Sequence, residues 1–106
     1  MEISQVVELV QALQKPKQVV KSPFVIGQNV FIRTVTLYYT GKVKDFNSQW
    51  VTLENASWIA DTGRFHDFLK DGKCNEYESF VDDVSIPVGS IIDVTKWNHV
   101  LFSGQK

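Results

Sequence analysis

A short segment from Asp61 to His66 contains the residue types best suited to hold an anion. It combines a glycine, a hydroxyl and a guanidinium at the junction between a predicted strand and a predicted helix. Free backbone N–H groups at a helix start favour an anion. Arg64 adds a bidentate contact to a phosphate group, and Thr62 either caps the helix or bonds a phosphate oxygen. The alternative is an ordinary capped turn in which Arg64 pairs with Asp67 or Asp71. A Walker loop is excluded because the segment has no second glycine and no Gly-Lys-Ser/Thr.

Aromatic side chains are the second group with a capacity for binding. The chain has three Trp, three Tyr and seven Phe, and most of them are needed for the core of so small a protein. Tyr38 and Tyr39 are adjacent in a predicted strand and therefore point to opposite faces, so at least one is expected to leave the core. Stacking of a base on such a ring contributes about 1–3 kcal/mol. The candidate ligand-binding residues are Arg33, Tyr38, Trp58, Asp61, Thr62, Gly63, Arg64, Phe65 and His66.

The sequence contains no recognisable catalytic or metal-binding arrangement. His66 and His99 are too isolated to define a metal site, and Cys74 is the single cysteine. Cys74, between Lys73 and Asn75, is expected to be a partly exposed and inert thiol. We therefore expect a protein that is not an enzyme and that uses no metal and no cofactor.

The length and the charge of the chain limit the classes of function that it can have. The chain has 106 residues, enough for a single domain, with eleven Lys and Arg against twelve Asp and Glu. A dedicated nucleic-acid binder usually carries a basic excess, so the balance argues against nucleic acid as the partner. No apolar stretch is long enough to span a membrane. The start of the chain carries an acidic residue where a signal peptide carries basic ones. These features predict a cytoplasmic protein.

The hydrophobic pattern predicts a mainly β domain. Apolar residues spaced for one face of a helix predict an amphipathic helix over residues 1–15, ended by Pro16. A β-rich unit follows over residues 24–102, with an insertion at 58–84 that contains a short helix at about 62–71. One strand is expected to run from Val30 to Tyr39 and end at Gly41, with turns at Asn47-Ser48, Glu54-Asn55 and Asp82-Asp83. A last strand is expected around Trp97 to Phe102.

One part of this pattern resembles a known fold family. The segment Gly41-Lys42-Val43-Lys44-Asp45-Phe46-Asn47-Ser48-Gln49-Trp50-Val51-Thr52-Leu53 is similar to the core motif of Sm-like barrels of the bacterial Hfq type. Gly89-Ser90-Ile91-Ile92-Asp93-Val94 is similar to the fifth strand of that fold. The resemblance implies a small Sm-like or SH3-like barrel behind a leading helix. The basic residue that the fifth strand of that fold usually carries is absent, since Asp93 stands near its place, so the resemblance favours the barrel over RNA binding.

A second resemblance covers residues 28–102. Phe31-Ile32-Arg33-Thr34-Val35-Thr36, Trp58-Ile59-Ala60-Asp61-Thr62-Gly63-Arg64-Phe65 and Gly89-Ser90-Ile91-Ile92-Asp93 look like a family of short phage and bacterial proteins of unknown function. It implies a phage or bacterial context, and therefore the cytoplasm of a bacterial host. By analogy with small phage proteins, we expect a homo-oligomer that sequesters a nucleotide-derived immune signal of the host. Arg64 would hold phosphate, and Tyr38, Trp58 or Phe65 would stack on the base. The alternatives are an RNA- or ssDNA-binding Sm-like module that uses Lys42, Lys44, Phe46 and Asn47, or a structural or host-protein-binding phage factor.

Overall fold

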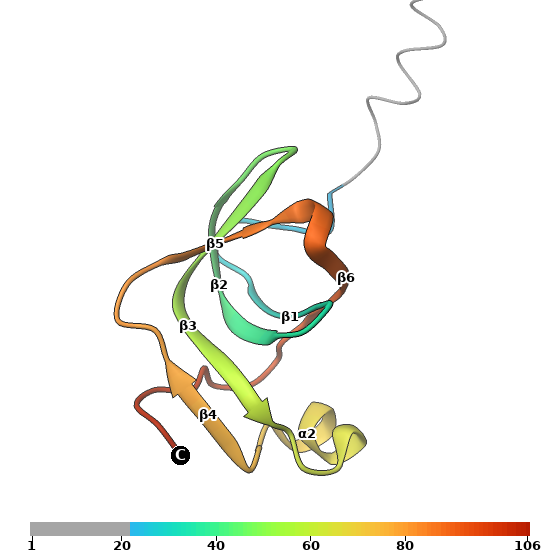
Figure 1. Cartoon of the computed structure of the whole chain (residues 1–106), viewed down its shortest axis with the longest axis vertical. Coiled ribbons are helices and arrows are strands. Elements are labelled where there is room, and N and C mark those ends of the chain that lie inside the picture. The colour runs from blue at the N-terminus through green and yellow to red at the C-terminus, as the bar shows by residue number, and fades with distance from the viewer. Residues whose placement is uncertain (1–21) are drawn as a thin grey trace, which may run out of the picture.

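The computed structural model describes residues 22–106, and within them the chain is mainly β, as predicted (Figure 1). Six strands form one antiparallel sheet: β1 (Asn29–Thr34), β2 (Tyr38–Phe46), β3 (Trp50–Asp61), β4 (Glu76–Ser79), β5 (Val84–Pro87) and β6 (Ile91–Lys96). One α-helix, α2 (Phe65–Asp71), and one 3₁₀ turn, η1 (Val88–Ser90), complete the described elements. The predicted helix over residues 1–15 lies outside the described residues.

The order of the strands makes the sheet curl. Along the main path the order is β4-β3-β2-β1-β6, and β5 pairs with β3. β5 pairs with the first part of β3, from Trp50 to Leu53, whereas β4 pairs with its last part, from Ser57 to Asp61. The three residues of η1 join β5 to β6. β6 pairs with β1 and forms one end of the main path. The short η1 link keeps the end of β5 next to the start of β6, so that this part of the sheet curls back on itself, as Figure 1 shows.

The predicted strand from Val30 to Tyr39 is wrong, because the chain turns back at residues 35–37 and forms the hairpin of β1 and β2. Thr34 closes the turn with both its backbone and its side chain. Its backbone N–H donates to the carbonyl of Leu37 over 2.8 Å, and its hydroxyl bonds the same carbonyl over 2.8 Å. Hydrogen bonds from a threonine side chain to the nearby backbone compete with the continuation of a strand. The β-branched composition of residues 30–39 predicts a continuous strand and gives no sign of this turn.

β2 and β3 continue through two positions where interruptions were expected. Gly41 lies inside β2, and Asn55 lies inside β3 with φ at 51°. Asn55 and Ala56 together oppose Gly41, which makes a β-bulge. A Cβ on Gly41 would lie 2.9 Å from the Cβ of Leu53. The glycine thus permits close packing of the bent strands rather than ending one.

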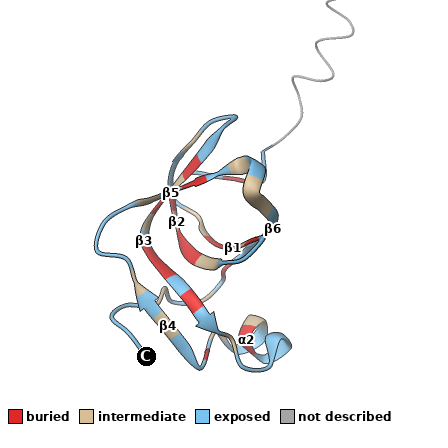
Figure 2. Cartoon of the chain, in the orientation of Figure 1, coloured by how far each residue is buried: buried red, intermediate tan, exposed pale blue. Residues whose placement is uncertain are grey.

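Most residues of β1 are buried (Figure 2). Their side chains lie on both faces of the sheet, and each face belongs to a separate core. Val30 and Ile32 lie in the first core, inside the curl, and their neighbours there are Phe24, Val43, Val51, Leu53, Ala56 and Ile86. Phe31 lies in the second core, on the outer face, with Ile59, Phe68, Cys74 and Trp97. The second core is covered by α2 and by the chain after β6.

The predicted helix at 62–71 is present but shorter, over Phe65–Asp71. Its expected cap from Thr62 is wrong, since Arg64 is the N-cap residue and makes no side-chain capping bond. The glycine stop is as predicted. Gly72 has a left-handed φ of 73°, and its N–H donates to the carbonyl of Phe68 over 2.9 Å.

The expected last strand around Trp97 to Phe102 is wrong. This segment is irregular because its large side chains serve the second core: Trp97 is buried in it, and Leu101 and Phe102 pack against it. The chain pairs with the sheet only further on, where Gln105 forms an isolated bridge with Glu78 of β4. None of the helices in the described part of the chain has the length and apolar character to cross a membrane.

Candidate ligand-binding site

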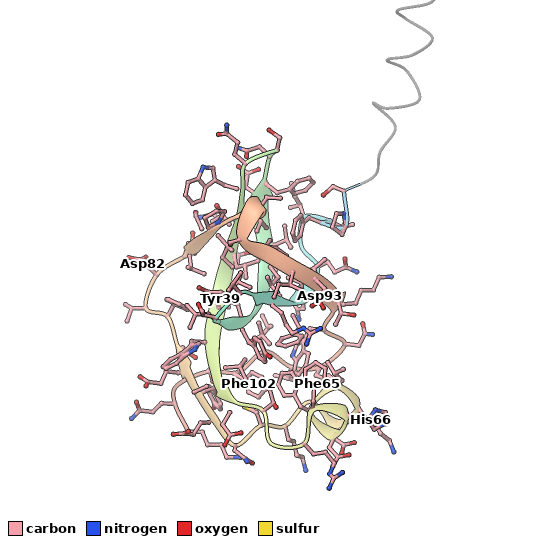
Figure 3. The ribbon with its side chains drawn as sticks, turned by 45° about the vertical axis from the view of Figure 1, so that its right-hand side comes forward. Tyr39, Phe65, His66, Asp82, Asp93 and Phe102 are labelled. Carbon is pink, nitrogen blue, oxygen red and sulfur yellow. The ribbon has the colours of Figure 1, made fainter. Side chains whose placement is uncertain are left out.

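Three of the predicted binding residues lie together on the outer face of the sheet. Arg33 of β1 and Tyr38 of β2 are direct partners across the hairpin. The Arg33 guanidinium lies 5.2 Å from the centre of the Phe65 ring. Figure 3 shows Phe65 turned from α2 toward the sheet. Arg33, Tyr38 and Phe65 therefore form one cluster at the end of the second core.

The charge of Arg33 is already matched by a carboxylate. Its Nε donates to both carboxylate oxygens of Asp93 on β6, over 2.8 and 3.1 Å, and its Nη2 donates to Oδ2 as well. The hydrogen bonds from Arg33 lower the pKa of Asp93, and those bonds raise the pKa of the guanidinium above its usual value. Arg33 is therefore committed to a neutral pair rather than free for a phosphate group.

The turn from Asp61 to Gly63 is closed by its own side chains. A carboxylate oxygen of Asp61 accepts the N–H of Gly63 over 2.8 Å, and the Thr62 hydroxyl donates to the carbonyl of Gly63 over 2.8 Å. The N–H of Asn75 donates to the backbone carbonyl of Asp61 over 2.8 Å and ties the turn to the chain after α2. The carboxylate of Asp61 thus occupies a donor that the anion hypothesis assigns to a ligand.

Arg64 and His66 are exposed at the start of α2. Figure 3 shows His66 on the outer side of the helix, away from the sheet. Within residues 22–106, Arg64 forms no ion pair with Asp67 or Asp71, which was the structural alternative for this residue. The binding of an anion by Arg64 stays a prediction.

Trp58 lies across the sheet from the Arg33 cluster. It is paired directly with Tyr39 of β2 on one side and with Glu78 of β4 on the other. Directly paired residues project from the same face of a sheet, so Trp58, Tyr39 and Glu78 form a row there. Tyr38 points to the opposite face, where it packs edge-on against Phe31 at 5.7 Å. The structure therefore separates Trp58 from Tyr38 and joins it to Tyr39.

The row around Trp58 forms an open pocket, here called the aromatic pocket. It has a volume of about 400 Å³ and is lined by Leu37, Tyr39, Trp58, Glu78, Ser79 and Phe80. The rings of Tyr39 and Phe80 are stacked at 6.0 Å with 23° between their planes. Trp58 is 36% exposed and Phe80 is 40% exposed, so both rings are accessible to a ligand.

The aromatic pocket can bind a flat, partly apolar ring by stacking. Its only ionisable carboxylate is Glu78, which accepts hydrogen bonds and donates none when ionised. A ligand that fits the pocket therefore presents a π-face to Trp58 or Phe80 and hydrogen-bond donors to Glu78. Nucleobases with amino groups meet both requirements.

Sequence reasoning named Trp58 but missed Tyr39, Glu78 and Phe80 as its neighbours. The alternation of Tyr38 and Tyr39 correctly separates their faces, but the expected exit of one tyrosine from the core is wrong, because both side chains are half-buried and each packs against one of the two cores. The pairing of Trp58 with Tyr39 and Glu78 depends on the register of three strands and on the bulge at Asn55. No spacing in the sequence reveals that register.

Cys74 is buried, 4% exposed, and not partly exposed as predicted. Its position in the second core raises the pKa of the thiol through desolvation. The described part of the chain contains no group of three His, Cys, Asp or Glu side chains placed to share a metal ion. The chain matches no known protein family, no curated protein and no solved structure.

Proposed function

We propose that this chain is a non-catalytic binding protein that takes up a small nucleotide-type ligand. The observation that carries the proposal is the aromatic pocket, in which Trp58 and Phe80 are exposed beside the carboxylate of Glu78. Aromatic rings contribute much of the binding energy at interfaces, because each buries a large apolar area on contact. The volume of about 400 Å³ lies within the range of small-molecule sites.

The chemistry of the pocket favours bases with adjacent donors. Guanine offers N1–H and the exocyclic amine side by side, and a carboxylate can accept both. Adenine and cytosine offer one amine, and uracil offers only a ring N–H. We therefore expect affinity to be highest for guanine and lowest for uracil if Glu78 reads the base edge.

The sequestering role extends this proposal. It rests on the resemblance to short phage and bacterial proteins, and it holds that the ligand is a nucleotide-derived signal of host immunity. An Sm-like or SH3-like barrel is part of the same proposal. The curl of the sheet and the η1 turn between β5 and β6 support it. Such a protein would bind its ligand intact and release it only when unfolded.

Capture from a nucleotide extract tests the function directly. The purified protein is incubated with the extract, washed and heated, and the released compounds are identified by mass spectrometry. We expect an unmodified nucleotide from the wild type and a large loss of capture in Trp58→Ala. Trp50→Ala is the matched control, because Trp50 is 45% exposed but lies outside the aromatic pocket.

The outcomes separate the rival functions. Release of an altered product indicates an enzyme, and no capture contradicts the proposal. Equal capture by Trp58→Ala and the wild type places the ligand elsewhere. Arg64→Ala is measured in parallel, since its loss of capture, with an unchanged melting temperature, would assign the phosphate contact to the turn before α2.

Homo-oligomer formation is a further part of the proposal. Several apolar side chains are well exposed, among them Val35 at 76%, Ile92 at 62% and Val100 at 88%. A second subunit can cover such side chains, and closed symmetry is the usual arrangement. Light scattering should give a mass above the 12.1 kDa of one chain. A single-chain mass at all micromolar concentrations contradicts this part alone.

The same exposed side chains favour one alternative, a factor that binds a host protein. The RNA- or ssDNA-binding alternative has less support from its own residues. Lys44 is paired with Asp83 over 2.6 Å, and the side-chain oxygen of Asn47 accepts the N–H groups of Gln49 and Trp50. Both groups are thus used within the fold. Binding of RNA with a dissociation constant tighter than about 10⁻⁸ M at physiological salt would restore that alternative.

A further inference from the structure

The aromatic pocket carries one negative charge that the described chain leaves unbalanced. Among the described residues that line it, Glu78 is the one charged side chain. Glu78 is exposed, and within the described part of the chain it belongs to no ion pair. Its carboxylate is therefore available to a cationic or hydrogen-bond-donating group of a ligand.

The three aromatic rings of the pocket add negative potential to this charge. Tyr39, Trp58 and Phe80 line the pocket, and the π-face of an aromatic ring is negative and attracts cations, most strongly in Trp. The Phe80 ring stacks on Tyr39 at 6.0 Å, and the backbone N–H of Phe80 donates to the carbonyl of Ala56 over 2.9 Å. Carboxylate and rings thus favour the same kind of ligand, a flat group with a positive charge.

The Arg33 cluster on the opposite face of the sheet shows what the aromatic pocket lacks. There, the guanidinium of Arg33 lies 5.2 Å from the centre of the Phe65 ring and is paired with the carboxylate of Asp93. Within residues 22–106, no Lys or Arg takes the corresponding position over the rings of the aromatic pocket. The pocket therefore has the rings and the carboxylate of such an arrangement without its cation.

A guanine ring can supply this positive charge and still make the hydrogen bonds proposed for Glu78. Its N1–H and exocyclic amine lie on one edge of the base, and N7 lies on the opposite edge. Alkylation at N7 makes the ring cationic and leaves both donors in place. A positive charge on the ring strengthens its hydrogen bonds to a carboxylate and its attraction to aromatic faces.

We propose that the aromatic pocket selects a positively charged guanine ring, of the N7-alkylated type, over neutral guanine. The carboxylate of Glu78 accepts N1–H and the exocyclic amine, and the ring stacks on Trp58 or Phe80. This inference rests on the proposed function, because it requires the base to occupy the aromatic pocket with its N1 edge toward Glu78.

The test compares two nucleosides that differ by one methyl group and one charge. Guanosine and 7-methylguanosine are titrated against the full chain by calorimetry, in weakly acidic buffer so that the methylated base keeps its N1–H. We expect 7-methylguanosine to bind about tenfold more tightly, as a cation–π contact and stronger hydrogen bonds allow. The advantage should decrease as salt is raised, because part of it is ionic. Choline, a cation with no flat ring, should bind much more weakly than 7-methylguanosine.

Glu78→Gln should remove most of the advantage of 7-methylguanosine, because a neutral amide does not attract the charge of the ring. Glu76→Gln is the matched control, since it removes the same charge from an exposed position of the same strand outside the aromatic pocket. It should keep the advantage.

The outcomes distinguish a failure of this inference from a failure of the proposed function. If guanosine and 7-methylguanosine bind equally, or if Glu78→Gln keeps the full difference, the selection of charge is overturned and the proposed function survives. If both variants lose the advantage equally, the effect is one of overall charge, which also overturns the assignment to Glu78. If choline binds as tightly as 7-methylguanosine, the pocket recognises a cation and not a base, and both proposals fail. Both also fail if neither nucleoside binds and the extract yields no captured nucleotide.

Discussion

The guanidinium of Arg33 lies 5.2 Å from the centre of the Phe65 ring and is held there by Asp93. One residue of the sheet thus joins β6 to α2, through an ion pair on one side and a cation–π contact on the other. Cation–π contacts of this kind add to packing when the cation is fixed over the ring. The pair is a structural link, and its stability should depend on the charge of Asp93.

The contribution of Asp93 to the stability of the fold should disappear in acid. Arg33 lowers the pKa of Asp93 in the folded protein. The stabilisation is therefore complete above the unfolded pKa of about 3.9 and is lost as pH falls through the lower folded pKa. Asp93→Asn should melt below the wild type at neutral pH, and the gap should close in acid. Thermal melts across pH measure this, and a gap that persists at the acid end would contradict it.

Phe68 should be the most costly residue of α2 to truncate. It is fully buried, and its ring lies 5.0 Å from Phe31 and 4.8 Å from Trp97. Phe68→Ala should reduce the free energy of unfolding by about 3–5 kcal/mol, because it leaves a cavity in the second core. Phe65→Ala on the same helix is the control and should cost clearly less, since Phe65 is 37% exposed. Urea denaturation of both variants gives the comparison, and equal losses would show that Phe68 is not the anchor.

Gly41 should not tolerate a side chain. An added Cβ would lie 2.9 Å from the Cβ of Leu53 and 3.2 Å from that of Ala56. Gly41→Ala should therefore destabilise the fold by about 1–3 kcal/mol through overpacking. Gly89→Ala has no atom within 4 Å of the new Cβ and should be neutral or slightly stabilising. If the two variants had the same melting temperature, the close approach of β2 and β3 would be refuted.

Gly72 and Gly104 separate backbone strain from steric contact. Both have left-handed φ values, 73° and 78°, so alanine costs about 1–2 kcal/mol at either position. At Gly72 the new Cβ would also lie 2.7 Å from the Cβ of His99, whereas at Gly104 it meets nothing within 4 Å. Gly72→Ala should therefore lower the melting temperature further than Gly104→Ala. A larger effect at Gly104 would contradict the packing of His99 against the end of α2.

Cys74 should react slowly with thiol reagents in the native protein. Burial limits access to the sulfur, and desolvation raises the pKa of the thiol, so less thiolate is present at neutral pH. Labelling with a chromogenic disulfide should be slow in buffer and fast in denaturant. A native rate equal to the denatured rate would mean that the second core opens readily around Cys74.

Local pattern was sufficient for the class of fold and for several elements. The period-two alternation, the turn at Asn47-Ser48 and the glycine stop of the helix each have a local cause, and each is found. The segment from Val30 to Tyr39 is divided into two strands by a turn that depends on the hydroxyl of Thr34. The high β propensity of the segment does not reveal this turn. The irregular path of the chain after Trp97 follows from the needs of the second core, which is a property of the whole fold.

The candidate site was only partly predictable for the same reason. Trp58 was singled out by residue type, but its neighbours are set by long-range register across β2, β3 and β4. The bulge at Asn55 shifts that register by one residue. The sequence pattern suggested a turn at Asn55, since asparagine favours both turns and left-handed bulges.

The burial of β1 on both of its faces has a consequence for how the protein unfolds. Val30 and Ile32 complete one core, and Phe31 completes the other. Neither core can lose its packing without exposing the strand on which the other is built. The two layers should therefore melt as one cooperative unit. In native-state hydrogen exchange, the amides of β1 should be among the last to exchange, at a rate that reports global unfolding.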